Sequence, residues 1–154
     1  MGSQSDLEAA WDTQWKRLGP SDCQPVHNYR FVAEEIVGPG PGIRKRIKDA
    51  GLKDWDIDRA WPAAGVKVGV ELQGGLWMQT RTGRGKGHAH PNKIINDYRK
   101  LNCAQALGWI VFQFDAQTLG RDPDGCVDLV RNAIEARSQK AVGNLPPMAF
   151  SVIF

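Results

Sequence analysis

The chain is poor in cysteine. Its three cysteines, Cys23, Cys103 and Cys126, are far apart, and none forms the Cys-x-x-Cys pair typical of a structural zinc site or a redox motif. An odd number of widely spaced cysteines also argues against the disulfide framework of a small secreted protein. We therefore expect reduced thiols in a cytoplasmic protein that has neither structural zinc nor disulfides.

The chain also lacks a long apolar run. No stretch approaches the ~20 residues that a helix needs to cross a bilayer, and residues 1–5 form a polar lead rather than the apolar core of a signal peptide. The 154 residues suit one domain with a single core. A net charge of +3 makes the chain mildly basic, which is compatible with a polyanionic partner but does not require one.

The most regular pattern in the sequence lies in residues 66–75. Every second residue at its start is apolar: Val66, Val68, Val70 and Leu72. This alternation predicts a strand with one face in a core. Residues 55–61 form a second extended stretch, and the composition of residues 62–65, Pro-Ala-Ala-Gly, is typical of a turn. The two strands should therefore pair as a hairpin.

Acidic and amide side chains gather on the outer face of this hairpin. Glu71 and Gln73 share one face of the second strand, and Asp58 on the first strand can approach them. Two converging carboxylates repel each other unless a proton or a cation lies between them, and Mg²⁺ is a common solution where all ligands are oxygen. The alternative is a structural pair in which each carboxylate binds a base such as Arg59 or Lys67.

An amphipathic helix is predicted for residues 6–18. Its apolar side chains recur at helical spacing: Leu7, Trp11, Trp15 and Leu18. Asp6 is a candidate N-cap. Glu8 lies at the border of the apolar stripe, where a carboxylate is most often solvated; the alternative is an auxiliary ligand of a metal or of water.

Positive charge is concentrated after a short strand predicted in residues 25–35 and a Gly-Pro breaker cluster in residues 38–42. Residues 43–52 form a short helix or an ordered loop, and they carry the densest basic cluster: Arg44, Lys45, Arg46 and Lys48. A solvated helix face explains this cluster as well as phosphate contacts do, because clustered lysine and arginine are also the groups that hold nucleic-acid backbones.

A second basic segment, residues 76–90, is rich in glycine and suits either a flap over a nucleic-acid groove or a surface loop. Its candidate phosphate contacts are Arg81, Arg84 and Lys86. His88 and His90 point the same way on an extended stretch, so one of them is a candidate general base or phosphate contact. Zinc binding is less favoured, since no cysteine or third histidine lies at ligand spacing.

The second half of the chain reads as helix, strand and helix. Residues 92–107 form an amphipathic helix, residues 109–114 a strand buried on both faces, residues 115–120 a turn, and residues 122–137 a final helix, before an apolar tail in residues 148–154. The first helix should bury Ile94, Ile95, Tyr98 and Leu101, and its other face carries Lys93, Asp97, Lys100 and Ala104.

Six landmarks follow one another between residues 6 and 137. They are a helix bearing Glu8, Trp55-x-x-Asp58, Glu71-Leu72-Gln73-Gly74-Gly75, a Gly/Arg-rich loop, Asp97-x-x-Lys100-x-Asn102, and Gly108-Trp109 before a strand to Phe114. This order resembles the PD-(D/E)XK nuclease superfamily, especially its small phage and bacterial members related to very-short-patch-repair endonucleases. The resemblance makes residues 1–154 a single nuclease domain, with residues 33–54 as an insertion and residues 138–154 as a C-terminal extension.

The resemblance implies an α/β fold with a restriction-endonuclease-like core, in which α-helices flank a mixed central β-sheet. It also implies an endonuclease that hydrolyses DNA with Mg²⁺, or with Mn²⁺ in its place, and that can act as a homodimer. Asp58, Glu71 and the main-chain carbonyl of Leu72 are the implied metal ligands. Gln73 stands where a catalytic lysine is common in the family, and Lys100 is the candidate to supply that ammonium group.

Gln73 also favours a second function, because an amide can neither deprotonate water nor carry positive charge. The alternative is a catalytically weak or inactive nuclease-fold protein that binds nucleic acid without cutting it. An enzyme acting on a small molecule has less support, since no phosphate-binding glycine loop stands between a strand and a helix.

Overall fold

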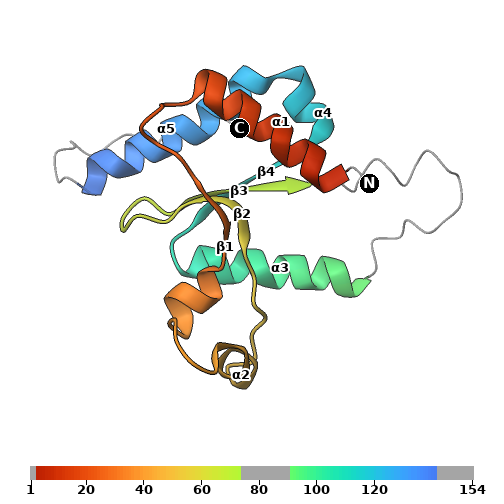
Figure 1. The fold of residues 1–154 in the computed structure, drawn as a ribbon, viewed down its shortest axis with the longest axis vertical. Coiled ribbons are helices and arrows are strands. Elements are labelled where there is room, and N and C mark those ends of the chain that lie inside the picture. The colour runs from red at the N-terminus through yellow and green to blue at the C-terminus, as the bar shows by residue number, and fades with distance from the viewer. Residues whose placement is uncertain (1–2, 74–90, 142–154) are drawn as a thin grey trace, which may run out of the picture.

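The computed structural model describes residues 3–73 and 91–141 (Figure 1). Its elements, in chain order, are α1 (Ser3–Leu18), β1 (Val26–Tyr29), the π-helix η1 (Val32–Ile36), α2 (Ile43–Asp49), β2 (Ile57–Trp61), β3 (Val68–Gln73), α3 (Pro91–Ala106), β4 (Ile110–Asp115), α4 (Ala116–Arg121) and α5 (Pro123–Ala141). None of the helices described in these ranges is long and apolar enough to cross a membrane. The sites predicted at Arg81, Arg84, Lys86, His88 and His90, and the apolar tail, lie outside the described residues.

The described strands form one mixed sheet in the order β1-β2-β3-β4. β2 pairs antiparallel with β1 and β3, which confirms the predicted hairpin, and β4 runs parallel to β3. Val70 on β3 lies opposite Arg59 on β2 and Phe112 on β4. Figure 1 shows α1, α4 and α5 on one side of the sheet and α3 on the other. The predicted mixed sheet flanked by helices is therefore confirmed.

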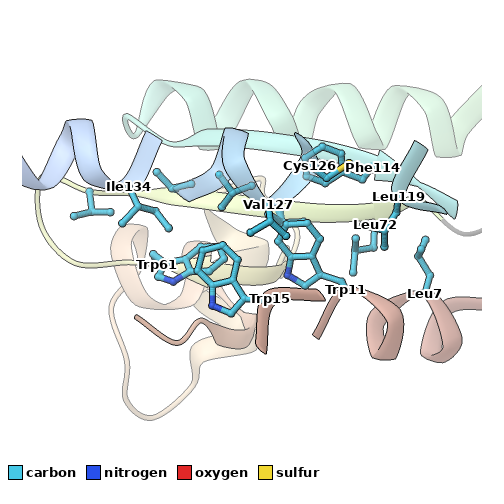
Figure 2. Close-up of a cluster of buried hydrophobic side chains, with 14 residues drawn as sticks. Leu7, Trp11, Trp15, Trp61, Leu72, Phe114, Leu119, Cys126, Val127 and Ile134 are labelled. Atoms are coloured by element: carbon cyan, nitrogen blue, oxygen red, sulfur yellow. The ribbon is translucent and has the colours of Figure 1, made fainter. Parts of the chain in front are cut away.

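The first hydrophobic core lies between α1, α5 and one face of the sheet (Figure 2). Leu7, Trp11 and Trp15 of α1 are buried at the predicted spacing. Trp11 stacks on Trp15 and on Phe114, with ring centroids 6.0 and 5.4 Å apart. Helix α1 begins at Ser3, so Asp6 lies in its first turn and is not the N-cap. The buried residues of α5 include Val127, Val130 and Ile134.

A second core lies on the opposite face of the sheet and includes part of the predicted insertion. Its buried members from that region include Ala33 and Ile47, and Phe31 and Val32 just before it are buried in the same core. They pack with Trp55, Ile57 and Trp109. The predicted strand over residues 25–35 ends early, at Tyr29, because the chain then turns into η1 and buries Val32 in this core.

Helix α3 has the predicted length, but a different face of the helix packs against the sheet. Ile94, Ile95 and Tyr98, which were expected to be buried, are 38%, 54% and 63% exposed. The face that lies on the sheet carries Asn96 and Lys100 and the buried Ala104. Polar contacts explain this choice, since Asn96 accepts a hydrogen bond from the Trp55 indole and Lys100 binds a carboxylate of the sheet. A buried carboxylate without a partner costs more than exposure of apolar side chains.

Strand β3 is buried on both faces, whereas its sequence pattern predicts one open face. Val68, Val70 and Leu72 lie in the first core as expected. The other face is covered because Gly69 lets neighbouring side chains approach closely: a Cβ at this position would come within 2.8 Å of Ile57 Cγ2. The carboxylate of Glu71, two residues later in β3, is therefore partly removed from water.

Strand β4 is less buried than predicted. It lies at one end of the described sheet, and only Phe114 is fully buried, while Gln113 is exposed. The strand was expected to be inner because its sequence is almost wholly apolar, yet no described strand covers its far edge. After β4, residues 116–121 form the short helix α4 rather than a turn, and Asp115 caps it by accepting a hydrogen bond from the Thr118 N–H.

Candidate functional site

Strand β3 and helix α3 bring Glu71 and Lys100 together. Lys100 Nζ donates a hydrogen bond to Glu71 Oε1 at 2.7 Å. The two side chains are only 15% and 11% exposed. The ammonium group predicted from the sequence therefore lies directly beside a predicted metal ligand.

Asp58 lies beside the end of β3. Its Oδ2 accepts a hydrogen bond from the main-chain N–H of Leu72 at 2.8 Å. The register pairs Arg59 with Val70, so Asp58 and Glu71 are the residues next to this pair on the two strands. The N–H and C=O of one residue in a strand point to the same side, so the Leu72 carbonyl also faces β2. The three predicted ligand groups thus come from adjacent positions of two paired strands.

Burial and acidic neighbours disfavour the charged forms of both carboxylates. Burial raises the pKa of Glu71 to about 7; Lys100 opposes this shift and Asp58 adds to it. Burial also raises the pKa of Asp58, the Leu72 N–H and Lys100 oppose it, and Glu8 and Asp56 add to it. The ionised carboxylates are therefore destabilised where they lie, and a further cation beside them would lower both pKa values.

Arg59 joins Glu8 of α1 to the strand that carries Asp58. Arg59 Nη1 donates to Glu8 Oε1 at 3.2 Å and to the main-chain oxygen of Asp58 at 2.7 Å. Asp12, one helical turn after Glu8, binds the same guanidinium through both carboxylate oxygens at 2.8 Å. Glu8 is therefore not simply solvated, and its position leaves the role of auxiliary ligand open.

The bases that were candidates to neutralise the two carboxylates bind other groups. The side chain of Arg59 turns to α1, as its place in the strand alternation predicts. Lys67 Nζ lies 2.6 Å from Glu35 Oε1 and donates to the main-chain oxygen of Leu107 at 2.8 Å. The base that binds Glu71 is therefore Lys100 rather than Arg59 or Lys67.

Gln73 lies at the end of β3 and contacts the neighbouring strand. Its Nε2 donates to Gln113 Oε1 at 3.4 Å. Gln73 and Glu71 share a strand face. The amide therefore interacts with β4 and supplies no charge to the carboxylates.

The basic cluster of α2 is partly structural. Arg46 donates hydrogen bonds to the main-chain oxygens of Val37 and Gly38 and so fixes the breaker segment before α2. Lys45 pairs with Asp49 one turn later and remains largely exposed. Figure 1 shows α2 beyond α3, away from the end of β3. Among the four basic residues of this predicted cluster, Arg44, Lys45 and Lys48 are exposed, whereas Arg46 binds main-chain oxygens of its own loop.

Sequence reasoning missed Arg59 and Asp12 as parts of the site. Their pairing joins α1 to β2 across 47 residues of sequence. A useful signal was available, because Asp12 follows Glu8 by one helical turn and both carboxylates therefore share a face of α1. An arginine on a predicted strand is a natural partner for two such carboxylates.

The donor set fits a hard divalent cation. Asp58, Glu71 and the Leu72 carbonyl offer only oxygen, and Mg²⁺ in proteins commonly takes one or two carboxylates and completes its shell with water and phosphate. Within residues 3–73 and 91–141, no group of three or more His, Cys, Asp or Glu side chains is placed to hold a metal. A cation held by Asp58 and Glu71 would therefore need water or other oxygen groups to complete its ligands.

Comparisons with known proteins add no information on function, so the geometry of the site is the principal evidence for it. No family model matches the chain, and neither the curated proteins nor the solved structures include a match.

Proposed function

We propose that this protein is a Mg²⁺-dependent endonuclease that hydrolyses phosphodiester bonds in DNA on a restriction-endonuclease-like fold. The observation that carries the proposal is the Lys100–Glu71 contact of 2.7 Å at the end of β3, together with the Asp58 carboxylate of β2, which accepts a hydrogen bond from the Leu72 N–H of β3. The order of sequence landmarks, which resembles the PD-(D/E)XK superfamily, supports the same reaction. Mn²⁺ is expected to replace Mg²⁺.

Asp58, Glu71 and the Leu72 carbonyl are the groups that would hold the cation. When bound, a divalent cation supplies Lewis-acid polarisation of a phosphate oxygen and lowers the pKa of a bound water. The Leu72 N–H keeps the Asp58 carboxylate in one orientation. The protein thus contributes a preorganised pair of oxygen donors at the end of a rigid strand.

Lys100 has a separate role. Lys100 lies on α3, which packs against the sheet, and its ammonium group donates a hydrogen bond to Glu71 of β3. A fixed positive charge at this place stabilises negative charge that develops on a phosphate during hydrolysis. Lys100 therefore replaces, from α3, the charge that the amide of Gln73 lacks.

Cleavage assays with matched variants test this proposal. Linear, nicked, mismatched and branched DNA are incubated with Mg²⁺ or Mn²⁺ and wild-type protein, Asp58→Asn or Glu71→Gln. Glu35→Gln is the control, because Glu35 also pairs with a lysine but lies outside the site. We expect cleavage by wild type and the control, and none by the two site variants. Equal cleavage by Glu71→Gln would place the active site elsewhere.

A nuclease-fold protein that binds DNA without cutting it is the second candidate. The contact of Gln73 with Gln113, in place of a lysine among the carboxylates, favours this alternative. Salt-dependent DNA binding by wild type, with no cleavage of any substrate in the panel under either metal, would support it.

A further inference from the structure

Helix α3 projects beyond the sheet at the end where the candidate site lies. The helix connects the parallel strands β3 and β4, so its first turns lie at the carboxyl ends of these strands. Figure 1 shows these turns extending past the tip of β3. Every residue from Pro91 to Ile95 is exposed, so no described segment covers this end of the helix on any side.

The face of α3 that carries Lys100 continues onto this projecting end. Lys93 precedes Lys100 by about two helical turns, so the two side chains share a face of the helix. Burial along this face decreases towards the N-terminus: Ala104 is 1% exposed and the Lys100 side chain 15%, whereas Lys93 is exposed. Lys93 therefore lies on the same side of α3 as the candidate site, about 10.5 Å beyond Lys100 along the helix axis.

The charge of Lys93 is available to a substrate. Lys100 is bound to Glu71. No ion pair in the described part of the chain includes Lys93, although Asp97 follows it by one turn. Lysine contacts with phosphates supply the salt-dependent part of DNA affinity and fix the position of the duplex on a protein. A strand that runs along α3 from the candidate site would bring one of its phosphates to Lys93.

We propose that Lys93 is a substrate-binding residue, which contacts a DNA phosphate about three base-pair steps from the scissile one and so holds the duplex along the projecting end of α3. This spacing compares about 10.5 Å along the helix with a rise of about 3.4 Å for each base-pair step. The inference rests on the proposed endonuclease function. It adds a contact to those predicted on α2, which lies away from the end of β3.

DNA binding without divalent ions tests this contact apart from cleavage. The affinity of wild type, Lys93→Met and Lys16→Met for a duplex is measured by fluorescence anisotropy at several salt concentrations. Lys16 is the matched control, because it is also an exposed helical lysine but lies on α1, across the sheet. Loss of one phosphate contact should reduce the slope of log K against log salt concentration by about 0.9 and weaken binding about 8-fold at about 0.1 M salt. An unchanged slope in Lys93→Met, or an equal change in Lys16→Met, overturns the proposal.

Neutral phosphates locate the contact. Each duplex carries a single methylphosphonate between one and about five steps from the cleavage site, and its cleavage with Mg²⁺ by wild type and Lys93→Met is compared. The neutral group near the third step should slow wild type at limiting protein concentration but have little further effect on Lys93→Met, because the contact is already lost. Equal effects on both proteins at every step contradict the proposal.

The two experiments separate this inference from the proposed function. A reduced slope in Lys93→Met with no cleavage of any duplex rejects the endonuclease and retains the phosphate contact. Cleavage by wild type with an unchanged slope in Lys93→Met rejects the contact alone. Absence of DNA binding by wild type rejects both.

Discussion

Two lysine–glutamate pairs lie on the same face of the sheet, near opposite ends of β3. Lys67 binds Glu35 at 2.6 Å just before the strand, and Lys100 binds Glu71 at 2.7 Å near its end. Glu35 is further satisfied by the indole N–H of Trp109 at 2.9 Å. Glu71 instead has a second acidic side chain, Asp58, as its neighbour.

The difference separates a structural ion pair from a candidate catalytic one. Both members of the Lys67–Glu35 pair have a further partner: Lys67 donates a hydrogen bond to the Leu107 carbonyl, and Glu35 accepts one from an indole. The pair formed by Lys100 has one cation facing two carboxylates, of which Glu71 has a pKa of about 7. Similar contacts therefore differ in their acidic neighbours: Asp58 disfavours the ionised form of Glu71, and a further cation beside Glu71 would favour that form.

The largest expected effect is the loss of cleavage in Asp58→Asn and Glu71→Gln. Each variant should cut DNA about 10³-fold more slowly or worse, because metal-based stabilisation of the transition state is worth several kcal/mol. Single-turnover rates on the best substrate of the panel measure this effect. Glu35→Gln should retain its rate after correction for the folded fraction, and a comparable loss in that control would contradict the distinction between the two pairs.

Lys100→Met should lower the cleavage rate about 10²-fold, the scale typical of one preorganised charge at a transition state. DNA binding, measured by fluorescence anisotropy, should change much less than the rate. A parallel loss of binding and rate would instead show that Lys100 is a simple phosphate contact.

The same two lysines should differ in their effect on stability. Lys67→Met leaves the Glu35 carboxylate largely buried without its cation, which should lower the free energy of unfolding by roughly 3 kcal/mol. Lys100→Met should cost less at pH 7, because Glu71 can take up a proton. Urea unfolding of both variants measures the difference in stability. Equal losses would argue against the distinction between the two lysine–glutamate pairs.

Stability should depend on pH through Glu71. Its pKa is about 7 in the folded protein against 4.5 for an ordinary glutamate, so the folded state binds more protons between these values. Stability from this group is therefore present below pH 4.5 and is lost as the pH rises to about 7, by up to roughly 3 kcal/mol. Urea unfolding across this range should show a shallower fall in Glu71→Gln. An unchanged slope in that variant would mean that Glu71 is ionised throughout.

The smallest effect is expected for Gln73. Because its amide contacts Gln113 of β4, Gln73→Ala should change the cleavage rate by less than about threefold and stability by about 1 kcal/mol or less. A loss like that of Lys100→Met would show that the amide takes part in catalysis.

Periodicity in the sequence predicted most elements of this fold. The spacing of Trp11 and Trp15 identified α1 and its buried face, and the alternation before Leu72 identified β3. The buried face of α3 was not predictable in the same way, because Ile95 and Tyr98 form the more apolar stripe but face away from the sheet. Contacts with partners far away in the sequence decided that orientation.

The candidate site was predictable where chemistry follows local spacing. Asp58 and Glu71 were found because paired strands bring opposite residues together, and Lys100 because the landmarks of a known family include it. Arg59 and Asp12 were missed, since their contact depends on how α1 lies across β2. Packing between distant elements therefore determined the part of the site that sequence patterns did not reveal.

Isothermal titration calorimetry with Mn²⁺ at pH 7 tests the central claim most directly. The account predicts that wild type and Glu35→Gln bind the ion at the same site with similar Kd, and that Asp58→Asn and Glu71→Gln bind it at least about 10-fold more weakly. Unchanged binding in both Asp58→Asn and Glu71→Gln would contradict the account.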